Sequence, residues 1–203
     1  MRIGVIAIQG AVSEHVEALQ RACAEKGVEA EVVEVKHRGI VPKCDGIVIP
    51  GGESTTLCRL LSREGIAEEI KDAAANGVPI MGTCAGLIVL AKEGDEQVAK
   101  TSQKLLGIMD TTVNRNAFGR QRESFEAELE VEGLDSPFTG IFIRAPAIVS
   151  CGPNVRILSK LDNLIIMAEQ RNVLALAFHP ELTDDLRIHQ YFLDKILKPK
   201  PEK

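Results

Sequence analysis

The chain has 203 residues, of which 45% are hydrophobic, 26% charged and only 3% aromatic. This length and composition are typical of one globular domain with a sizeable hydrophobic core. The 24 Lys and Arg residues are outnumbered by 29 Asp and Glu residues, which gives a net charge of −5, and there is one Tyr and no Trp. The chain therefore lacks the positive field and the stacking side chains of nucleic-acid-binding proteins, and we expect no nucleic acid partner.

The amino-terminal sequence MRIGVIAIQG and the cysteine pattern indicate the cellular location of the protein. The apolar run in MRIGVIAIQG is too short for a secretory signal and far below the roughly 20 residues of a membrane span. The five cysteines contain no C-x-x-C pair, so they suit neither a disulfide framework nor a zinc site. They are Cys23, Cys44, Cys58, Cys84 and Cys151. We expect a cytoplasmic protein with reduced thiols and no membrane association.

Apolar runs rich in β-branched residues alternate with helical periodicity in the first half of the chain. This alternation is typical of βαβ units and predicts an α/β fold with a mostly parallel sheet. The predicted strands are residues 2–8, 29–35, 45–49 and 78–81. The predicted helices are residues 12–26, 54–61 with Ser54 as the cap, 66–75 and 87–92.

The second half has a different pattern. Residues 123–132 alternate polar with apolar side chains, and further short strands are expected at 155–158, 164–168 and 173–178. These segments predict an antiparallel extension of the sheet.

The last helix is expected to start at Thr183, with Asp184 and Asp185 in its first turn, and to reach about residue 197. Residues 94–103 have the composition of a loop, and residues 199–203 that of a flexible tail. No internal linker divides the remainder, so we expect a single domain over residues 1–198.

Cys84 lies in a G-x-C-x-G segment between a predicted strand and a predicted helix. This is the thiol counterpart of the G-x-S-x-G elbow, in which small flanking residues permit a strained turn that exposes a nucleophile. A helix amino terminus increases the thiolate fraction of a cysteine, and the next backbone N–H can stabilise an oxyanion. The pentapeptide is equally compatible with a structural cysteine beside packing glycines. The other four cysteines lack this setting and are expected to fill the core.

His179 and Glu181 follow an apolar strand in the sequence FHPE. In extended backbone, side chains at i and i+2 project to the same side, so the carboxylate can orient the imidazole toward a thiol. Because the carboxyl ends of strands line one crevice of an α/β sheet, we expect these residues to lie near Cys84. A surface hydrogen bond is the ordinary alternative for the pair, and a metal site with His189 is a weaker one.

Three loops remain as candidates for ligand contacts. PGGES at 50–54 follows a strand and allows backbone amides to approach a ligand, although it lacks the G-K-[ST] ending of a phosphate loop. The other two contain Arg115 and Arg144, either of which could bind a carboxylate or simply be solvated.

The motifs GTCAGL at 82–87, PGGESTT at 50–56 and FHPEL at 178–182 resemble those of class I, triad-type glutamine amidotransferases. Four further segments make the sequence similar to the glutaminase subunits of pyridoxal 5′-phosphate synthases. They are QGAVxEH at 9–15, RNAFGRQ at 115–121, FxGxFIRAP at 138–146 and FHPELT at 178–183. The resemblance covers nearly the whole chain and implies a three-layer α/β/α, flavodoxin-like fold.

The resemblance also implies roles for individual residues. Cys84 would be the nucleophile of a triad with His179 and Glu181, and the amides of Gly51 and Ala85 would form the oxyanion hole. Glutamine would contact Gly52, Glu53, Ser54, Arg115, Ile143 and Arg144. No metal is implied.

The implied reaction is hydrolysis of L-glutamine to L-glutamate and ammonia through a γ-glutamyl thioester. In this family the ammonia passes to a synthase subunit that builds pyridoxal 5′-phosphate from a pentose phosphate and a triose phosphate. That cofactor is the product of the pathway, so no cofactor is expected here. The expected complex is a dodecameric synthase core carrying glutaminase subunits that are poorly active until docked. An independent γ-glutamyl cysteine hydrolase and a non-catalytic binding module are the alternatives.

Overall fold

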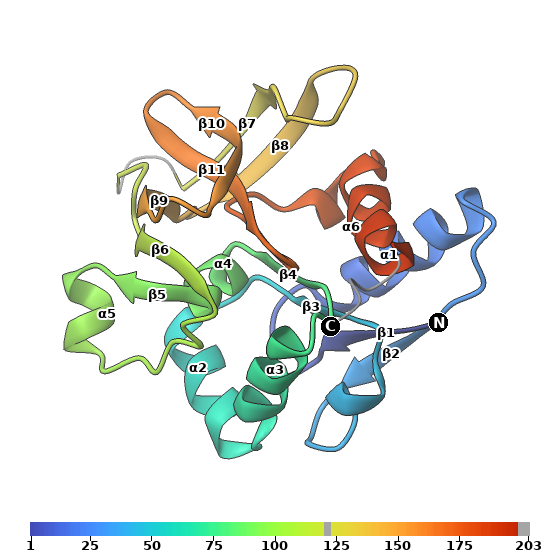
Figure 1. The fold of residues 1–203 in the computed structure, drawn as a ribbon. Helices are drawn as coiled ribbons and strands as arrows, with labels where there is room; N and C mark the ends of the chain where they lie inside the picture. Colours follow the sequence, from blue (N-terminus) through green and yellow to red (C-terminus); the bar gives the residue numbers. More distant parts are fainter. Residues whose placement is uncertain (120–122, 199–203) are drawn as a thin grey trace.

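The computed structural model describes residues 1–119 and 123–198, which form a large mixed sheet with helices on both faces (Figure 1). The large sheet has ten strands in the order β2-β1-β3-β4-β12-β11-β9-β6-β5, and β10 pairs with β11. A separate two-stranded sheet consists of β7 and β8. The predicted α/β fold with a mostly parallel sheet and an antiparallel extension is confirmed.

The parallel part of the large sheet contains five strands. They are β1 (Arg2–Ile6), β2 (Glu31–Val35), β3 (Gly46–Ile49), β4 (Ile80–Thr83) and β12 (Val173–Leu176). Every residue of β3, β4 and β12 is buried, which explains why these strands appear in the sequence as continuous apolar runs. The first four strands begin and end within two residues of the predicted positions.

The helices form two groups, one on each face of this sheet. On one face, α1 (Val12–Glu25) packs against α6 (Arg187–Leu197). On the other, α2 (Ser54–Arg63) packs against both α3 (Ile66–Ala75) and the short α4 (Ala85–Leu90). Figure 1 shows α1 and α6 together on one side of the central strands and α2 and α3 on the other, so the expected three layers are present.

The antiparallel part extends from β12. It contains β11 (Leu164–Gln170), β10 (Arg156–Leu161), β9 (Ala147–Cys151) and β6 (Met109–Asn114), and at its far edge β5 (Ala91–Gly94) pairs with β6 in parallel. Of these strands, the sequence predicted only β10 and β11. The predicted helix over 87–92 is wrong at its end, because Ala91 already begins β5.

Residues 123–132 do form a strand, β7 (Ser124–Leu129), but their assignment to the sheet extension is wrong. β7 pairs only with β8 (Phe138–Ile143), and this hairpin is fixed to the large sheet by aromatic packing. Phe125 stacks on Phe142 with ring centroids 4.7 Å apart, and Phe142 lies 5.8 Å from Phe178, which follows β12. Phe118 and Phe138 complete the cluster, which holds five of the six phenylalanines of the chain. The hairpin is therefore attached at the end of β12.

Two predicted helix caps, Ser54 and Thr183, are wrong, because a carboxylate and not a hydroxyl contacts the first amides of each helix. Glu53 caps α2 and accepts hydrogen bonds from the amides of Thr55 and Thr56, whereas Ser54 is the first helical residue. At α6 the helix begins at Arg187 instead of near Thr183. Asp185 accepts the Arg187 N–H at 3.0 Å, which satisfies one donor of that helix end.

Residues 94–103 were expected to be a loop but contain α5 (Glu96–Lys100). The Asp95 carboxylate caps this short helix by accepting from the amides of Gln97 and Val98. The sequence contains the cap signal, yet five residues are too few to show a helical periodicity.

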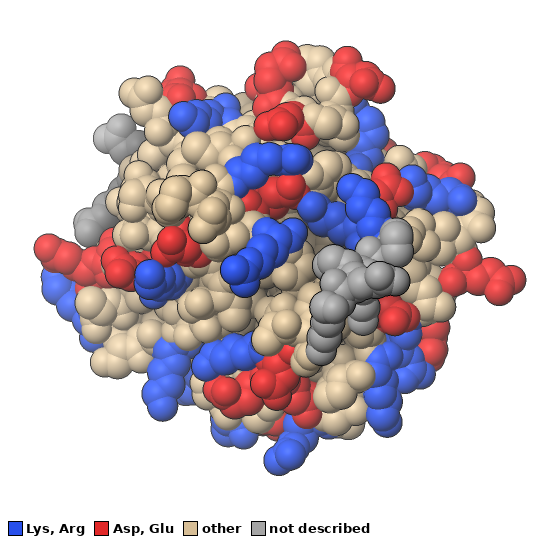
Figure 2. All heavy atoms as spheres, viewed as in Figure 1, with Lys and Arg blue, Asp and Glu red and all other residues tan. Residues whose placement is uncertain are grey.

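Acidic and basic side chains are intermixed on the face of the molecule seen in Figure 2, as the nearly balanced composition predicts. None of the helices in the described ranges combines the length and apolarity needed to cross a lipid bilayer. The tail predicted at 199–203 and three residues of the RNAFGRQ segment and its flank, 120–122, lie outside the described residues.

The two glycines of G-x-C-x-G allow α4 to lie directly on the sheet. A Cβ atom on Gly86 would be 2.2 Å from the carbonyl oxygen of Ile49 in β3. A Cβ atom on Gly82 would be 2.7 Å from the carbonyl carbon of Gly86. Both obstacles are backbone atoms, so these positions accept no side chain without a shift of the helix or of a central strand.

We therefore predict that Gly86→Ala lowers the free energy of unfolding by about 2–3 kcal/mol, as overpacking against immobile groups does. The matched variant is Gly77→Ala, where φ is +77° but nothing lies within 4 Å of the added Cβ. That variant should lose only about 1 kcal/mol, from backbone strain. Urea unfolding of both measures the difference, and equal losses would contradict the packing argument.

Candidate active site

The candidate site lies where three neighbouring parallel strands end. In the register of the sheet, Ile49 of β3 pairs with Gly82 of β4, and Thr83 of β4 pairs with Leu176 of β12. The chain leaves these strands as Pro50-Gly51, Cys84 and Ala177-Phe178-His179. Residues far apart in sequence thus meet at one edge of the sheet, as expected for an α/β fold.

Cys84 occupies a strained turn between β4 and α4. Its φ is 50° and its ψ −107°, a conformation that residues with a side chain rarely adopt. The Cys84 N–H donates to the Leu176 carbonyl of β12 at 2.8 Å, which anchors the turn to the neighbouring strand. Ala85 is the first residue of α4, so its amide belongs to the unpaired donors of a helix amino terminus. This is the elbow that the G-x-C-x-G segment predicts.

His179 links the thiol to a carboxylate. Its Nδ1 donates to Glu181 Oε1 at 2.7 Å, because a carboxylate only accepts, and the same ring also interacts with Cys84. Glu181 lies in a short 3-10 turn, Pro180–Leu182, so the i, i+2 approach arises from a turn and not from the extended backbone we expected. All three side chains are buried.

The charges in this trio favour a protonated imidazole. Burial opposes the charged form of His179, but the hydrogen bonds with Cys84 and Glu181 and their negative charges outweigh burial. Together they raise the pKa of His179 well above its usual range. An imidazolium beside a sulfur stabilises a thiolate, the reactive form of cysteine.

Two further histidines, which the sequence analysis did not connect with a triad, lie behind Glu181. His15 Nε2 is 3.3 Å from Glu181 Oε2 and 3.0 Å from Thr83 Oγ1, and His15 Nδ1 is 3.4 Å from His189 Nε2. Burial, followed by the charges of His189 and His179, lowers the pKa of His15 well below its usual range. Burial lowers that of His189 to about 4. Both are therefore neutral at pH 7.

The turn after β3 lies directly against the trio. A Cβ atom on Gly51 would be 2.6 Å from His179 Cε1 and 3.2 Å from Cys84 Cβ, so only glycine fits there. Gly52 has a φ of +139°, and the Gln9 side-chain amide donates to the Glu53 carbonyl at 2.5 Å. The hydroxyl of Ser54 is buried and has no hydrogen-bond partner in the described part of the chain.

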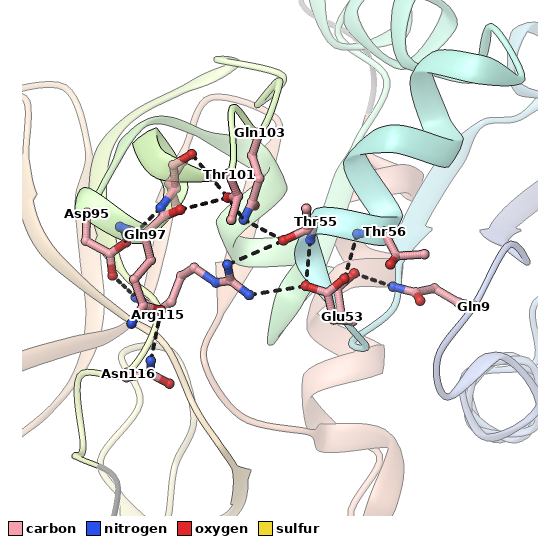
Figure 3. Close-up of polar contacts among 11 residues, drawn as sticks. Gln9, Glu53, Thr55, Thr56, Asp95, Gln97, Thr101, Gln103, Arg115 and Asn116 are labelled. Atoms are coloured by element: carbon pink, nitrogen blue, oxygen red, sulfur yellow. Dashed lines mark hydrogen bonds and ion pairs between the residues drawn. The ribbon is translucent and has the colours of Figure 1, made fainter.

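Arg115 reaches this turn from the end of β6 (Figure 3). Its guanidinium contacts Glu53 Oε1 at 3.2 Å and Thr55 Oγ1 at 3.4 Å, while its backbone N–H donates to Asp95 at 2.8 Å. Burial opposes ionisation of Glu53, but donors from Thr56 and Thr55 outweigh it and lower its pKa to about 2. Glu53 is thus an anion at neutral pH that caps α2 and holds the arginine.

Ile143 is the last residue of β8, and Arg144 follows it, on the other side of Cys84. Cys84 Sγ is 3.8 Å from the Ile143 carbonyl oxygen, and the His179 N–H donates to the Ile141 carbonyl at 2.8 Å. Arg144 is exposed, with φ at +44°, and its backbone N–H donates to Glu123. The hairpin therefore contacts two members of the trio through its backbone.

Within residues 1–119 and 123–198, no group of three or more His, Cys, Asp or Glu side chains is arranged to hold a metal ion. His189 contacts His15 and not His179, so the three residues considered for a metal site do not converge. The remaining cysteines are free; Cys23, Cys44 and Cys58 are buried, and Cys151 is half-buried.

This arrangement of a cysteine elbow, a histidine and a carboxylate at the carboxyl edge of an α/β sheet matches the one that the resemblance to class I, triad-type glutamine amidotransferases implies. A sequence model of the SNO glutamine amidotransferase family matches residues 5–198, and the chain belongs to this family. The predicted relationship to glutamine amidotransferases is thereby confirmed.

Curated relatives agree over the full length. The chain is 82% identical to the pyridoxal 5′-phosphate synthase subunit PdxT of Methanosarcina barkeri, covering 98% of this chain and 99% of the relative. It is 54% identical to the protein of the same name from Archaeoglobus fulgidus, covering 95% and 97%.

Solved structures give the same architecture. A crystal structure described as a glutamine amidotransferase superimposes with a TM-score of 0.85 at 45% identity, covering 96% of this chain and 98% of that one. A glutamine amidotransferase from Thermotoga maritima has a TM-score of 0.64 at 13% identity and shares the fold.

The buried histidines make the fold sensitive to acid. His189 is neutral when folded, with a pKa of about 4 against 6.5 when exposed, so the unfolded state binds more protons between these values. Stability should fall as pH decreases from about 6.5 toward 4. We predict that His189→Gln reduces this slope by up to about 1.4 kcal/mol per pH unit, the effect of one proton.

The matched control is His37→Gln, because His37 is exposed. Urea unfolding at several pH values gives the slope for each protein. An unchanged slope in His189→Gln, or an equal change in His37→Gln, would contradict the assignment of a buried neutral histidine.

Proposed function

We propose that this chain is the glutaminase subunit of a pyridoxal 5′-phosphate synthase and hydrolyses L-glutamine to L-glutamate and ammonia. The observation that carries the proposal is the position of His179, which hydrogen-bonds Glu181 on one side and Cys84 on the other. A thiol nucleophile, a base and a group that orients the base are what acyl transfer through a thioester requires. The sequence relationship to subunits named for that synthase supports the choice of pathway.

In the first half-reaction the Cys84 thiolate attacks the side-chain carbonyl carbon of glutamine. The carbonyl oxygen becomes an oxyanion, for which the amides of Gly51 and Ala85 are the proposed donors. His179 gives its proton to the amide nitrogen, the C–N bond breaks, and ammonia leaves. A γ-glutamyl thioester on Cys84 remains.

In the second half-reaction water attacks the thioester. His179 now takes a proton from the water, the C–S bond breaks, and glutamate and the free thiol are released. Glu181 holds the imidazole in the orientation needed for both steps and stabilises its charged form. Atoms balance as glutamine plus water giving glutamate plus ammonia.

The loops around Cys84 supply the proposed binding site for glutamine. Arg115, already placed against the Gly52–Ser54 turn, and the exposed Arg144 are proposed to bind the α-carboxylate. Glu53, an anion at neutral pH, suits the α-ammonium group. The unpartnered Ser54 hydroxyl and the backbone at Ile143 are the remaining proposed contacts.

The synthase subunit is the proposed partner, in a complex with a dodecameric synthase core, and the cytoplasm is the proposed location. Residues 1–198 are proposed to act as one domain. An independent γ-glutamyl hydrolase on the same fold would be fully active without the synthase subunit, and a binding module would release no glutamate.

The central test is glutamate release from glutamine by the purified chain, alone and with a pyridoxal 5′-phosphate synthase subunit. We expect release to rise with the partner. Cys84→Ala should lower it by at least about a thousandfold, as loss of a nucleophile does. The matched variant Cys151→Ala makes the same change at a half-buried cysteine at the end of β9 and should remain active. Equal activity in the two variants would refute the assignment of Cys84.

Arg115→Ala should raise the KM for glutamine about 10- to 100-fold, because a hydrogen-bonded charge pair contributes roughly 1.5–3 kcal/mol. Arg144→Ala should act in the same direction. Arg59→Ala, at an exposed position of α2, is the control and should leave KM unchanged. Steady-state kinetics of the complex measures all three, and an unaltered KM in both test variants would exclude the carboxylate-binding role.

A further inference from the structure

We propose that His15 is a positioning residue for the triad, which directs its Nε2–H toward the second oxygen of Glu181 and thereby fixes the carboxylate that orients His179. The inference rests on the proposed glutaminase function. It starts from an asymmetry in Glu181, whose Oε1 is hydrogen-bonded to His179 at 2.7 Å while its buried Oε2 has no aligned hydrogen bond in the described residues. His15 Nε2 lies 3.3 Å from this oxygen.

The proton positions in this cluster follow from the charges. His15 Nε2 faces both the Glu181 carboxylate and the Thr83 hydroxyl oxygen. A bare nitrogen lone pair 3.3 Å from a buried carboxylate would be repelled, so Nε2 carries the hydrogen. That N–H is aligned with Thr83 Oγ1 at 3.0 Å and attracts Glu181 Oε2 electrostatically.

The hydrogen on His15 Nε2 also determines how His15 contacts His189 of α6. Since neutral His15 has its hydrogen on Nε2, its Nδ1 is an acceptor, and His189 Nε2 at 3.4 Å must be the donor. His189 Nδ1 is then a bare acceptor nitrogen, and it is indeed buried without a partner in the described part of the chain. The opposite tautomer would bury an unpaired N–H, which is rarer in proteins.

The result is a continuous series of contacts from α6 to Cys84, in which His189 donates to His15 and the Glu181 carboxylate faces an N–H of His15 on one side and of His179 on the other. Among the described residues, the titratable side chains in printed contact with the Glu181 carboxylate are His179 and His15. His15 and His189 are fully buried and neutral, so they orient the carboxylate without adding charge to the site.

The first test reads the tautomers directly, without activity. The ¹⁵N chemical shifts of the imidazole nitrogens in the ¹⁵N-labelled full chain at pH 7 should show neutral His15 and His189, each with its hydrogen on Nε2. A hydrogen on Nδ1 of His15, or a charged His15, would overturn the proposal.

The second test uses three variants of His15 in the complex with the synthase subunit. His15→Gln places an amide N–H near the position of Nε2 and should keep kcat within about threefold. His15→Asn is equally polar but places its amide near Nδ1, away from Glu181, and His15→Leu has no donor. Both should lower kcat at least about tenfold with an unchanged KM for glutamine, because the dipole that attracts Glu181 Oε2 is lost or moved away from this buried carboxylate.

Thermal melting and the unmodified protein serve as controls. If the unmodified complex releases no glutamate, the proposed function fails and the tautomer measurement alone decides the role of His15. If the complex is active and His15→Leu has normal kcat, the positioning role is refuted. If the three variants His15→Gln, His15→Asn and His15→Leu lower kcat in proportion to their decrease in melting temperature, His15 has a purely structural role and the proposal is overturned.

Discussion

The backbone conformation of Cys84 is the constraint on which the site depends. A non-glycine residue at φ 50° and ψ −107° costs about 1–3 kcal/mol, so the surroundings must hold it there. Three features do so. The N–H of Cys84 is hydrogen-bonded to β12. Gly82 and Gly86 have no side chains, which leaves room for the first turn of α4 to pack directly on β4 and β3. Cys84 is thus fixed by three adjacent strands and not by its loop alone.

The same three strands determine where the other functional groups lie. Gly51 follows β3 and His179 follows β12, so the close packing at Gly51 brings the backbone amides near the thiol while leaving no space for a side chain. The hairpin of β7 and β8 closes the other side through the carbonyls of Ile141 and Ile143. The parallel direction of these strands, which the alternation of strands and helices predicts, therefore accounts for most of the geometry of the candidate site.

Electrostatics separates the buried groups into two kinds. Burial opposes the charged form of all three histidines. In His179 the hydrogen bonds with Cys84 and Glu181 outweigh burial and raise the pKa. In His15 the charges of His189 and His179 act in the same direction as burial, so its pKa falls although Glu181 lies 3.3 Å away.

The sequence predicted those features that depend on local pattern. The parallel strands, α3 and the elbow at Cys84 follow from apolar runs and from glycine spacing, and the position of His179 follows from the rule for strand ends. Features set by distant partners were missed: β5, β6 and β9 are defined by their neighbours, and β7 has the alternation of a sheet strand but pairs only with β8.

Ser54 and Thr183 look like helix caps, yet Glu53 caps α2 and Asp185 supports the start of α6. His15 is an ordinary helical position in the sequence, and only the approach of α1 to the 3-10 turn at Glu181 gives it a role.

The aromatic cluster has a practical consequence for spectroscopy. The chain has no Trp, and its single Tyr, Tyr191, lies on α6 with its hydroxyl bonded to Glu169, outside the five phenylalanines that attach the hairpin to β12. Phe118 is a half-buried member of that cluster. An indole placed there would be the only one in this chain, so its fluorescence would report on the hairpin beside Cys84.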